Sequence, residues 1–427
     1  MSADVLPHLR PIRAIRYLGY VAAGGILLAA TAVIVTSGSS TPLASQPGDN
    51  EGRTLEVGND RAHTTISDAV VAALPGDTIR IHEGVYGESV RLTRQVTLEA
   101  AKDDEVWIDG QCQRDNGIHV HSGRETEIIG IGIRNTIGAG VLIGYTGDES
   151  ERPERITVRQ MTIENFDCRG GEAQHNAGIA VWNAGCCMRL LDNLISYRSD
   201  AVTRGYGNGI WFKSTDTSPS GGDHLIARNA VIGGWDGIGG ETEGDIHGSF
   251  DRATLIDDNV ITGCWDDGIQ SEGGNQEITI RDNKITGCGT GIAFAPTLLG
   301  PLIIFKNEIT DLQAGLYENL FCFKTGGETG DTGIVRLTEN TCDTAGDGIL
   351  HTNAGLPVII AARNCFQVSR YVIQLGDEIR DGTVFNKNTL WTTDRGRFID
   401  WGGRRYDSLE EFRETGNEAD GAQSRSC

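Results

Sequence analysis

A repeated motif constrains the fold of this chain more than any other feature. An asparagine followed by an apolar residue, and then a Gly-Ile pair or its equivalent about eight residues later, recurs along the sequence. A unit of this kind contains short alternating segments and turn residues, so it cannot bury a hydrophobic face alone and must stack on its neighbours at roughly 4.8 Å. We predict an all-β solenoid of about eleven coils, with the asparagines hydrogen-bonded in a column at one turn. These asparagines are Asn135, Asn165, Asn193, Asn229, Asn259, Asn283, Asn307, Asn340, Asn364 and Asn388.

Short capping helices are expected at both ends of the stack. Residues 64–74 form an amphipathic pattern with a Thr cap, followed by a Pro-Gly-Asp turn and a strand at 78–82. At the other end, Ser408 and Glu411 form a capping box for a helix that ends near Gly416. Helices in these places would cover the open edges of the end coils.

The two end segments also carry a resemblance to a known family. Residues 64–92 look like the entry segment, and residues 406–421 look like the C-terminal cap, of right-handed parallel β-helix proteins in the pectin lyase-like superfamily. The resemblance covers about residues 54–420 and implies that the solenoid is a right-handed parallel β-helix. This superfamily includes pectate and alginate lyases, polygalacturonase-like hydrolases, epimerases and non-catalytic surface proteins, so the resemblance alone does not determine an activity.

The first 40 residues have the pattern of a targeting segment. Three arginines precede an uncharged, mostly apolar run at 17–36 that is just long enough to cross a bilayer. The basic flank stays in the cytoplasm, so the rest of the chain is expected outside. We predict a signal peptide or N-terminal membrane anchor over 1–40, a linker over 41–53 and a β-helix domain over 54–427, in a secreted or cell-surface protein.

The charge balance narrows the choice of partners. With 37 basic and 59 acidic side chains, the formal net charge is −22. Such a chain lacks the clustered cations that nucleic-acid binding requires. It would also repel a polyanionic glycan unless a divalent cation such as Ca²⁺ bridges the two.

The ten cysteines are compatible with disulfides in an exported chain. Cys264 and Cys288 occupy the same repeat position, five residues after the asparagine, so they form either a disulfide between coils or stacked buried thiols. Cys186 and Cys187 are adjacent, which favours partners elsewhere or buried thiols. No cysteine or histidine spacing suits zinc.

Alternation after each Gly-Ile pair predicts columns of outward-facing side chains, and these contain the candidate catalytic residues. Asp236 and Asp267 precede the glycine in successive coils, with Asp266 beside them. Carboxylates about one strand spacing apart cannot all ionise freely, which is typical of a general acid or of a Ca²⁺ site. Lys213 is a candidate base and His247 a further candidate on the same edge. A structural explanation fits these residues equally well, because aspartate before glycine favours tight turns and a salt bridge to Glu241 would account for Lys213.

Neighbouring positions supply candidate ligands for a sugar and a cation. Four tryptophans and a glutamine fall on the same coils, suited to contact with sugar rings or to packing under turns. The candidate substrate-binding residues are Trp182, Trp211, Trp235, Trp265 and Gln270, and the candidate Ca²⁺ ligands are Glu241, Glu272 and Asp245.

Two classes of function fit these patterns. In the first, an exported enzyme cleaves an acidic or uronic-acid-containing polysaccharide. The triplet Asp236, Asp266 and Asp267 resembles the three aspartates of polygalacturonase-like hydrolases, although that family's His and Arg/Lys motifs lack their usual form. A lyase would instead use Lys213 or an arginine as base beside Ca²⁺ held by Glu241 and Glu272. In the second class, the chain is a non-catalytic glycan-binding or surface-structural protein.

Overall fold

The computed structural model describes residues 52–144, 152–171, 175–197, 207–214, 219–240, 246–248, 250–314, 320–326, 333–352, 355–376, 379–394 and 396–426. The predicted targeting segment, nearly all of the linker, and two predicted metal ligands, Glu241 and Asp245, lie outside these residues. Within the described part, no helix has the length and apolar character that crossing a bilayer demands.

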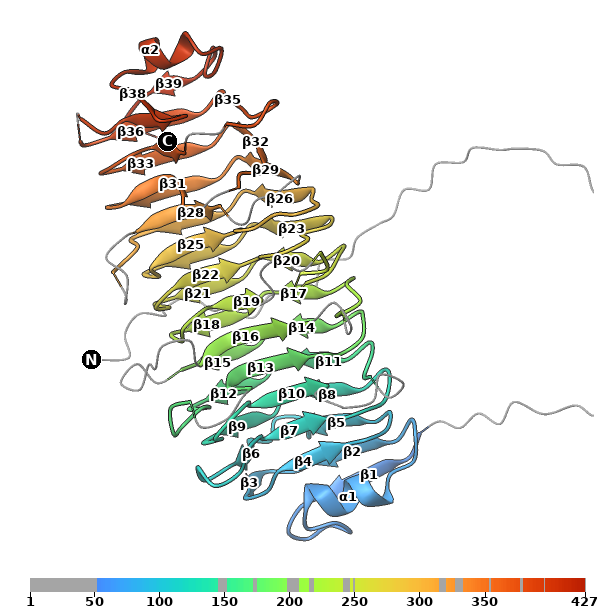
Figure 1. Cartoon of the computed structure of the whole chain (residues 1–427). Helices are drawn as coiled ribbons and strands as arrows, with labels where there is room; N and C mark the ends of the chain where they lie inside the picture. The colour runs from blue at the N-terminus through green and yellow to red at the C-terminus, as the bar shows by residue number, and fades with distance from the viewer. Residues whose placement is uncertain are drawn as a thin grey trace, which may run out of the picture. The chain divides into compact units, whose positions relative to one another are not determined.

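The described coils form three sheets of thirteen strands each, which we call sheets A, B and C (Figure 1). Sheet A contains β1 (Thr54–Val57), β2 (Thr78–Ile81), β5 (Thr97–Ala100), β8 (Glu127–Ile129), β11 (Thr157–Arg159), β14 (Arg189–Leu191), β17 (Leu225–Ala227), β20 (Leu255–Asp257), β23 (Ile278–Arg281), β26 (Leu302–Phe305), β29 (Ile334–Thr338), β32 (Val358–Ala362) and β35 (Val384–Asn386). Sheet B contains β3 (Gly84–Tyr86), β6 (Val106–Asp109), β9 (Gly132–Arg134), β12 (Thr162–Glu164), β15 (Leu194–Ser196), β18 (Ala230–Ile232), β21 (Val260–Thr262), β24 (Lys284–Thr286), β27 (Glu308–Thr310), β30 (Thr341–Thr344), β33 (Cys365–Val368), β36 (Thr389–Thr392) and β39 (Ala422–Gln423). Sheet C contains β4 (Val90–Leu92), β7 (Ile118–Val120), β10 (Val141–Gly144), β13 (Ala177–Trp182), β16 (Asn208–Lys213), β19 (Ile238–Gly240), β22 (Asp267–Gln270), β25 (Thr290–Ala293), β28 (Phe321–Thr325), β31 (Asp347–His351), β34 (Ile373–Leu375), β37 (Ile399–Trp401) and β38 (Arg404–Tyr406).

The stacking of the coils is parallel and in register, as the repeat predicted. In sheet C, Ile210 pairs with Ile238, Ile238 with Ile269, and Ile269 with Ile292, and all four side chains are fully buried. Among the described strands, only the terminal β38 pairs antiparallel, with β37. The stack is longer than the eleven coils expected, because β1 to β6 form coils that precede the first asparagine motif. The all-β solenoid is confirmed.

The asparagine column is confirmed over most of its length. From Asn193 to Asn388, each asparagine donates from its side-chain Nδ2 to the Oδ1 of the next asparagine in the column at 2.8–2.9 Å. The same Oδ1 also accepts from the backbone N–H of the preceding asparagine in the column, as Asn229 Oδ1 does from Asn193. The column lies at the turn between sheets A and B, and the Glu418 carboxylate accepts from its last member, Asn388. Asn135 and Asn165 were wrongly included: they follow β9 and β12 instead of preceding a sheet B strand, and they bond to each other.

Both predicted capping helices are present. Helix α1 (Ile66–Ala72) has Thr65 as its N-cap, whose side chain accepts from the Asp68 N–H. Helix α2 (Leu409–Arg413) has Ser408 as its N-cap, accepting from the Glu411 N–H.

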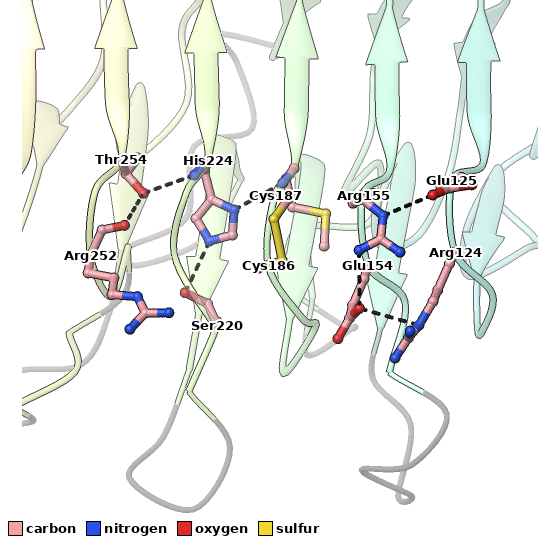
Figure 2. Close-up of a disulfide and its surroundings, with 11 residues drawn as sticks. Arg124, Glu125, Glu154, Arg155, Cys186, Cys187, Ser220, His224, Arg252 and Thr254 are labelled. Carbon is pink, nitrogen blue, oxygen red and sulfur yellow. Dashed lines mark hydrogen bonds and ion pairs between the residues drawn. A yellow bond between two sulfur atoms is a disulfide. The ribbon is translucent and has the colours of Figure 1, made fainter. Parts of the chain in front are cut away.

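Four disulfides join described cysteines: Cys112–Cys168, Cys186–Cys187, Cys264–Cys288 and Cys322–Cys342. The Cys264–Cys288 bond settles the choice that the sequence left open. For Cys186 and Cys187 the prediction of distant partners or buried thiols is wrong, because the two half-buried residues bond to each other. Cys187 has a φ of 70°, in the left-handed region, where the chain turns from β13 to β14. Figure 2 shows this pair one coil away from the buried imidazole of His224, which bonds to Ser220.

Candidate functional site

Three aspartates meet at the corner of the stack where each coil passes from sheet B to sheet C. Asp236 lies two residues before β19, Asp266 immediately precedes β22, and Asp267 is the first residue of β22. Because Ile238 pairs with Ile269, the register places Asp236 directly opposite Asp267. One carboxylate oxygen from each of the three aspartates lies within 4.8 Å of the other two. The column predicted from the sequence therefore does bring these carboxylates together.

One oxygen of Asp236 supports the backbone of this corner. The Asn208 Oδ1 accepts from the Asp236 N–H at 3.0 Å, and the Asp236 Oδ1 accepts from the Asp267 N–H at 3.1 Å. The same bond recurs farther along the column, where the Asp347 Oδ1 accepts from the Tyr371 N–H. A turn-stabilising role is thus real for Oδ1, and it leaves Oδ2 of Asp236 for other chemistry.

The sequence did not identify Lys324, which forms an ion pair with one of the three aspartates. Its Nζ donates to the Asp267 Oδ2 at 2.8 Å. The register explains the contact, since Gln270 pairs with Ala293 and Ala293 with Lys324, two coils beyond Asp267. Burial lowers the pKa of Lys324, but the carboxylates of Asp267, Glu272 and Asp266 outweigh that effect and raise it overall.

Asp236 differs electrostatically from its neighbours. Burial, together with the charges of Asp267 and Asp266, raises the pKa of the Asp236 carboxyl well above its usual range. Asp236 is 5% exposed, and Gly239 lies closely against it: a Cβ added to Gly239 would lie 3.3 Å from Asp236 Oδ2 and 3.5 Å from Gln270 Oε1, so glycine at this position avoids crowding the carboxyl group. A buried carboxyl group with a raised pKa therefore lies directly beside Gly239 of β19.

The aromatic candidates are mostly covered. Trp182, Trp211 and Trp235 are each 7% exposed, and the first two belong to a small hydrophobic cluster on the outer side of sheet C, separate from the interior of the stack. The Lys213 Nζ lies over the rings of Trp182 and Trp211, at 4.8 and 5.6 Å from their centroids. Packing around Lys213 is therefore the main role visible for these two rings, and little of their surface remains for a sugar.

The other candidates lie around the aspartates or beside them. Trp265 and Gln270 are partly exposed in the β22 coil, and Glu272 is buried near Lys324. His247 lies 3.2 Å from the Asp251 carboxylate, Nδ1 to Oδ1. The structure thus groups Gln270 and Glu272 with the aspartate cluster.

The three aspartates also have the composition of a calcium site, since Ca²⁺ takes carboxylate oxygens at 2.3–2.6 Å. The Asp267 Oδ1 is buried and has no hydrogen-bond partner among the described residues, so it could accept a cation. However, Lys324 already supplies a positive charge to the other oxygen of the same carboxylate. Of the Asp267 and Asp236 oxygens, those that Lys324 and the described backbone leave for a cation are Asp267 Oδ1 and Asp236 Oδ2.

Known proteins share the fold of this chain at low sequence identity. No curated protein matches the sequence. Among solved structures, the Streptococcus pneumoniae surface adhesin PfbA is 12% identical, with a TM-score of 0.51 and coverage of 76% of this chain and 85% of that one. A mutant tailspike protein of E. coli bacteriophage HK620 in complex with a pentasaccharide is 10% identical, with a TM-score of 0.51 and coverage of 83% and 72%. An alginate lyase from Paenibacillus sp. is 12% identical, with a TM-score of 0.47 and coverage of 71% and 99%.

At these identities the likenesses show the fold and not the activity. A family model described as a right handed beta helix region matches residues 113–319 and 248–390. The two matches together span more than half of the chain, and the protein belongs to the right-handed β-helix family.

Proposed function

We propose that this protein is an exported glycoside hydrolase that cleaves a polysaccharide at the corner formed by Asp236, Asp266 and Asp267. The observation that carries the proposal is that two neighbouring carboxyl groups, those of Asp236 and Asp267, have different electrostatic environments. Asp236 is buried and has a raised pKa, whereas Asp267 forms an ion pair with Lys324. Glycoside hydrolysis requires one protonated and one ionised carboxyl group beside the scissile bond.

The geometry gives each group a role. Asp236 donates its proton from Oδ2, the oxygen beside Gly239, to the glycosidic oxygen as the bond to the sugar carbon breaks. Asp266 is the more exposed of the three, and its carboxylate accepts a proton from the water that attacks this carbon. Lys324 and Asp267 act on Asp236 electrostatically, because their ion pair holds a second carboxylate beside the acid.

A calcium-dependent lyase is the second candidate, and the unpartnered Oδ1 of Asp267 favours it. In that case Asp236, Asp266 and Asp267 would hold the ion, which would neutralise the carboxylate of a uronate. Lys213 is then the expected base, although its Nζ contacts two indole rings. Binding of a cation and protonation of Asp236 relieve the same repulsion, so the two candidates make opposite predictions for a chelator.

The fold also fits a carbohydrate ligand. The tailspike structure that shares it contains a bound pentasaccharide, and a polysaccharide is the substrate we propose here. The acidic composition of the chain favours a neutral or weakly charged glycan over a polyanion when no cation is bound.

The test is incubation of the purified protein with neutral and uronic-acid polysaccharides, following both reducing ends and the ultraviolet absorbance of unsaturated ends. Hydrolysis predicts reducing ends without absorbance, unaffected by chelator and lost in Asp236→Asn. The exposed Asp343 of β30 provides a matched control, since Asp343→Asn removes one carboxylate away from the corner. If unsaturated-end absorbance appears and is lost when chelator is added, the protein is a cation-dependent lyase and the hydrolase proposal is wrong. If a folded sample releases no product from any glycan, the protein is a binding or structural one.

A further inference from the structure

A cavity of about 560 Å³ lies beside the last coil, away from the aspartates. Its lining includes Trp391 and Thr392 of β36, Asp394 and Phe398 of the next turn, Asp407 after β38 and Gln423 of β39. Strands β36 and β39 are paired, with Leu390 opposite Gln423, and lie together at the C-terminal end of the stack (Figure 1). The volume is within the usual range for a small-molecule site.

The indole of Trp391 is incompletely satisfied. Its Nε1 is buried and has no hydrogen-bond acceptor among the described residues. Buried indole N–H groups usually find an acceptor, so this donor is suited to an oxygen supplied by a ligand. The comparable Trp107 of β6, also on sheet B, donates its Nε1–H to the Glu105 carboxylate at 2.8 Å.

The remaining polar groups complement a hydroxyl-rich ligand. Two contacts orient the Asp394 side chain. Its Oδ1 accepts from the Gly396 N–H, and its Oδ2 lies 3.6 Å from the Arg397 Nε. Asp407 adds a second carboxylate and Gln423 an amide, which accept from and donate to hydroxyl groups. Phe398 supplies apolar surface. Two carboxylates in one cavity disfavour an anionic ligand, while a neutral sugar offers both the acceptor that Trp391 lacks and donors for the acids.

The cavity also lies in line with the aspartates. Asp394 and Phe398 occupy the turn from sheet B to sheet C, the same corner that Asp236 and Asp267 occupy in earlier coils. From β22 to β37 the order of sheet C is five steps, or about 24 Å at the usual strand spacing. A glycan of several residues laid along this corner could reach both places.

We propose that this cavity is a second carbohydrate-binding site, which holds a neutral sugar residue of a glycan whose chain extends along the corner toward Asp236. The proposal rests on the proposed function for the class of ligand, but it concerns binding and does not require cleavage.

Calorimetric titration of the full chain carrying Asp236→Asn tests it, with neutral six-residue oligosaccharides from cellulose, xylan, mannan and starch as probes. We expect one of these to bind, and Trp391→Phe to weaken its binding roughly five- to tenfold, the effect of losing one buried hydrogen bond. Trp107→Phe is the matched control and should leave affinity unchanged. Gln423→Ala, at an exposed position, should also weaken binding and guards against misfolding of the tryptophan variant.

Failure of this inference and failure of the proposed function are distinguishable. Binding that weakens by the expected amount in Trp391→Phe supports the second site even if no glycan is cleaved. Cleavage without any effect of Trp391→Phe or Gln423→Ala on oligosaccharide affinity would overturn it, as would binding of oligo-uronides in preference to every neutral probe.

Discussion

Replacing Lys324 by methionine tests the electrostatics of the aspartate corner most directly. The Lys324 Nζ lies 2.8 Å from the Asp267 Oδ2, and the two side chains are 20% and 0% exposed. At that separation and an effective dielectric constant of about 20, the Coulomb attraction is about 6 kcal/mol, before the cost of desolvating both groups. Methionine keeps the volume of the side chain and leaves the Asp267 carboxylate buried without its cation. Breaking a buried pair in this way costs about 3–5 kcal/mol.

The expected result is a fall in melting temperature of about 6–10 °C at pH 7, taking roughly 2 °C per kcal/mol for a chain of this size. Because the raised pKa of Lys324 lies far above neutrality, the contribution of its charge is present throughout pH 5–9 and is lost only at strongly alkaline pH. In Lys324→Met, protonation of the crowded carboxyl groups removes their mutual repulsion and stabilises the fold. The difference in melting temperature between the variant and the wild type should therefore shrink as the pH falls from 7 to 4. Thermal melts by circular dichroism at several pH values measure both effects.

Lys284 provides the control for this experiment. Its Nζ lies 3.7 Å from a Glu308 oxygen, but the two side chains are 67% and 53% exposed, so Lys284→Met should cost less than about 1 kcal/mol. If Lys324→Met melts within about 2 °C of Lys284→Met at pH 7, or shows no narrowing of the deficit in acid, then the ion pair does not organise the corner and the roles given to Asp267 and Asp236 are wrong.

Three further predictions concern single side chains. Asp236→Asn should lower the rate of cleavage by at least about 100-fold. Its melting temperature at pH 8 should equal or exceed that of the wild type, because the raised pKa of Asp236 means that the charged form opposes folding. Kinetic assays and thermal melts on one sample check both results. Asn283→Ala should lower the free energy of unfolding by about 3 kcal/mol in urea titrations, because it removes bonds to Asn307, to a backbone carbonyl and from the preceding coil. His224 is buried neutral with its pKa lowered to about 3, so the wild type should lose stability as the pH falls from about 6.5 toward 3, and His224→Gln should make that decline shallower in pH-dependent melts.

Each of these three has an outcome that would contradict it. Retention of cleavage by Asp236→Asn would remove the general acid from the proposal. An Asn283→Ala variant as stable as the wild type would mean that stacking of aliphatic residues alone sets the register. Identical pH profiles for the wild type and His224→Gln would show that His224 is not buried in solution.

The sequence was sufficient for the fold because the repeat carries its information locally. Each Gly-Ile pair and each turn asparagine specifies the same step, and parallel stacking then multiplies it. The errors arise where two different turns contain the same residue type. Asn135 and Asn165 were counted with the column although they follow their strands, and only the pairing of Thr162 with Leu194 shows that Asn165 is four residues out of phase with Asn193.

The candidate site was predicted only in part, for a related reason. Asp236, Asp266 and Asp267 precede visible Gly-Ile pairs, so counting placed them in one column. Lys324 could not be found in this way because Cys322 stands where the neighbouring coils have Gly291 and Gly348, and the insertion before it breaks the spacing from Asn307. The adjacent thiols of Cys186 and Cys187 carried no repeat signal at all. Their pairing depends on the backbone conformation of one turn.

The corner explains how a structural residue can acquire a chemical role in a repetitive fold. A side-chain oxygen that accepts from the next coil's N–H is needed at several coils, and Asn208, Asp236 and Asp347 all provide it. An asparagine satisfies that need as well as an aspartate, and without a charge. Placing a carboxyl group at Asp236, opposite Asp267, therefore adds repulsion that the backbone does not require. Lys324 offsets the charge of Asp267, and protonation of Asp236 would offset a second charge. The carboxyl group of Asp236 is therefore the feature that backbone stability does not explain, and it is also the group that can transfer a proton.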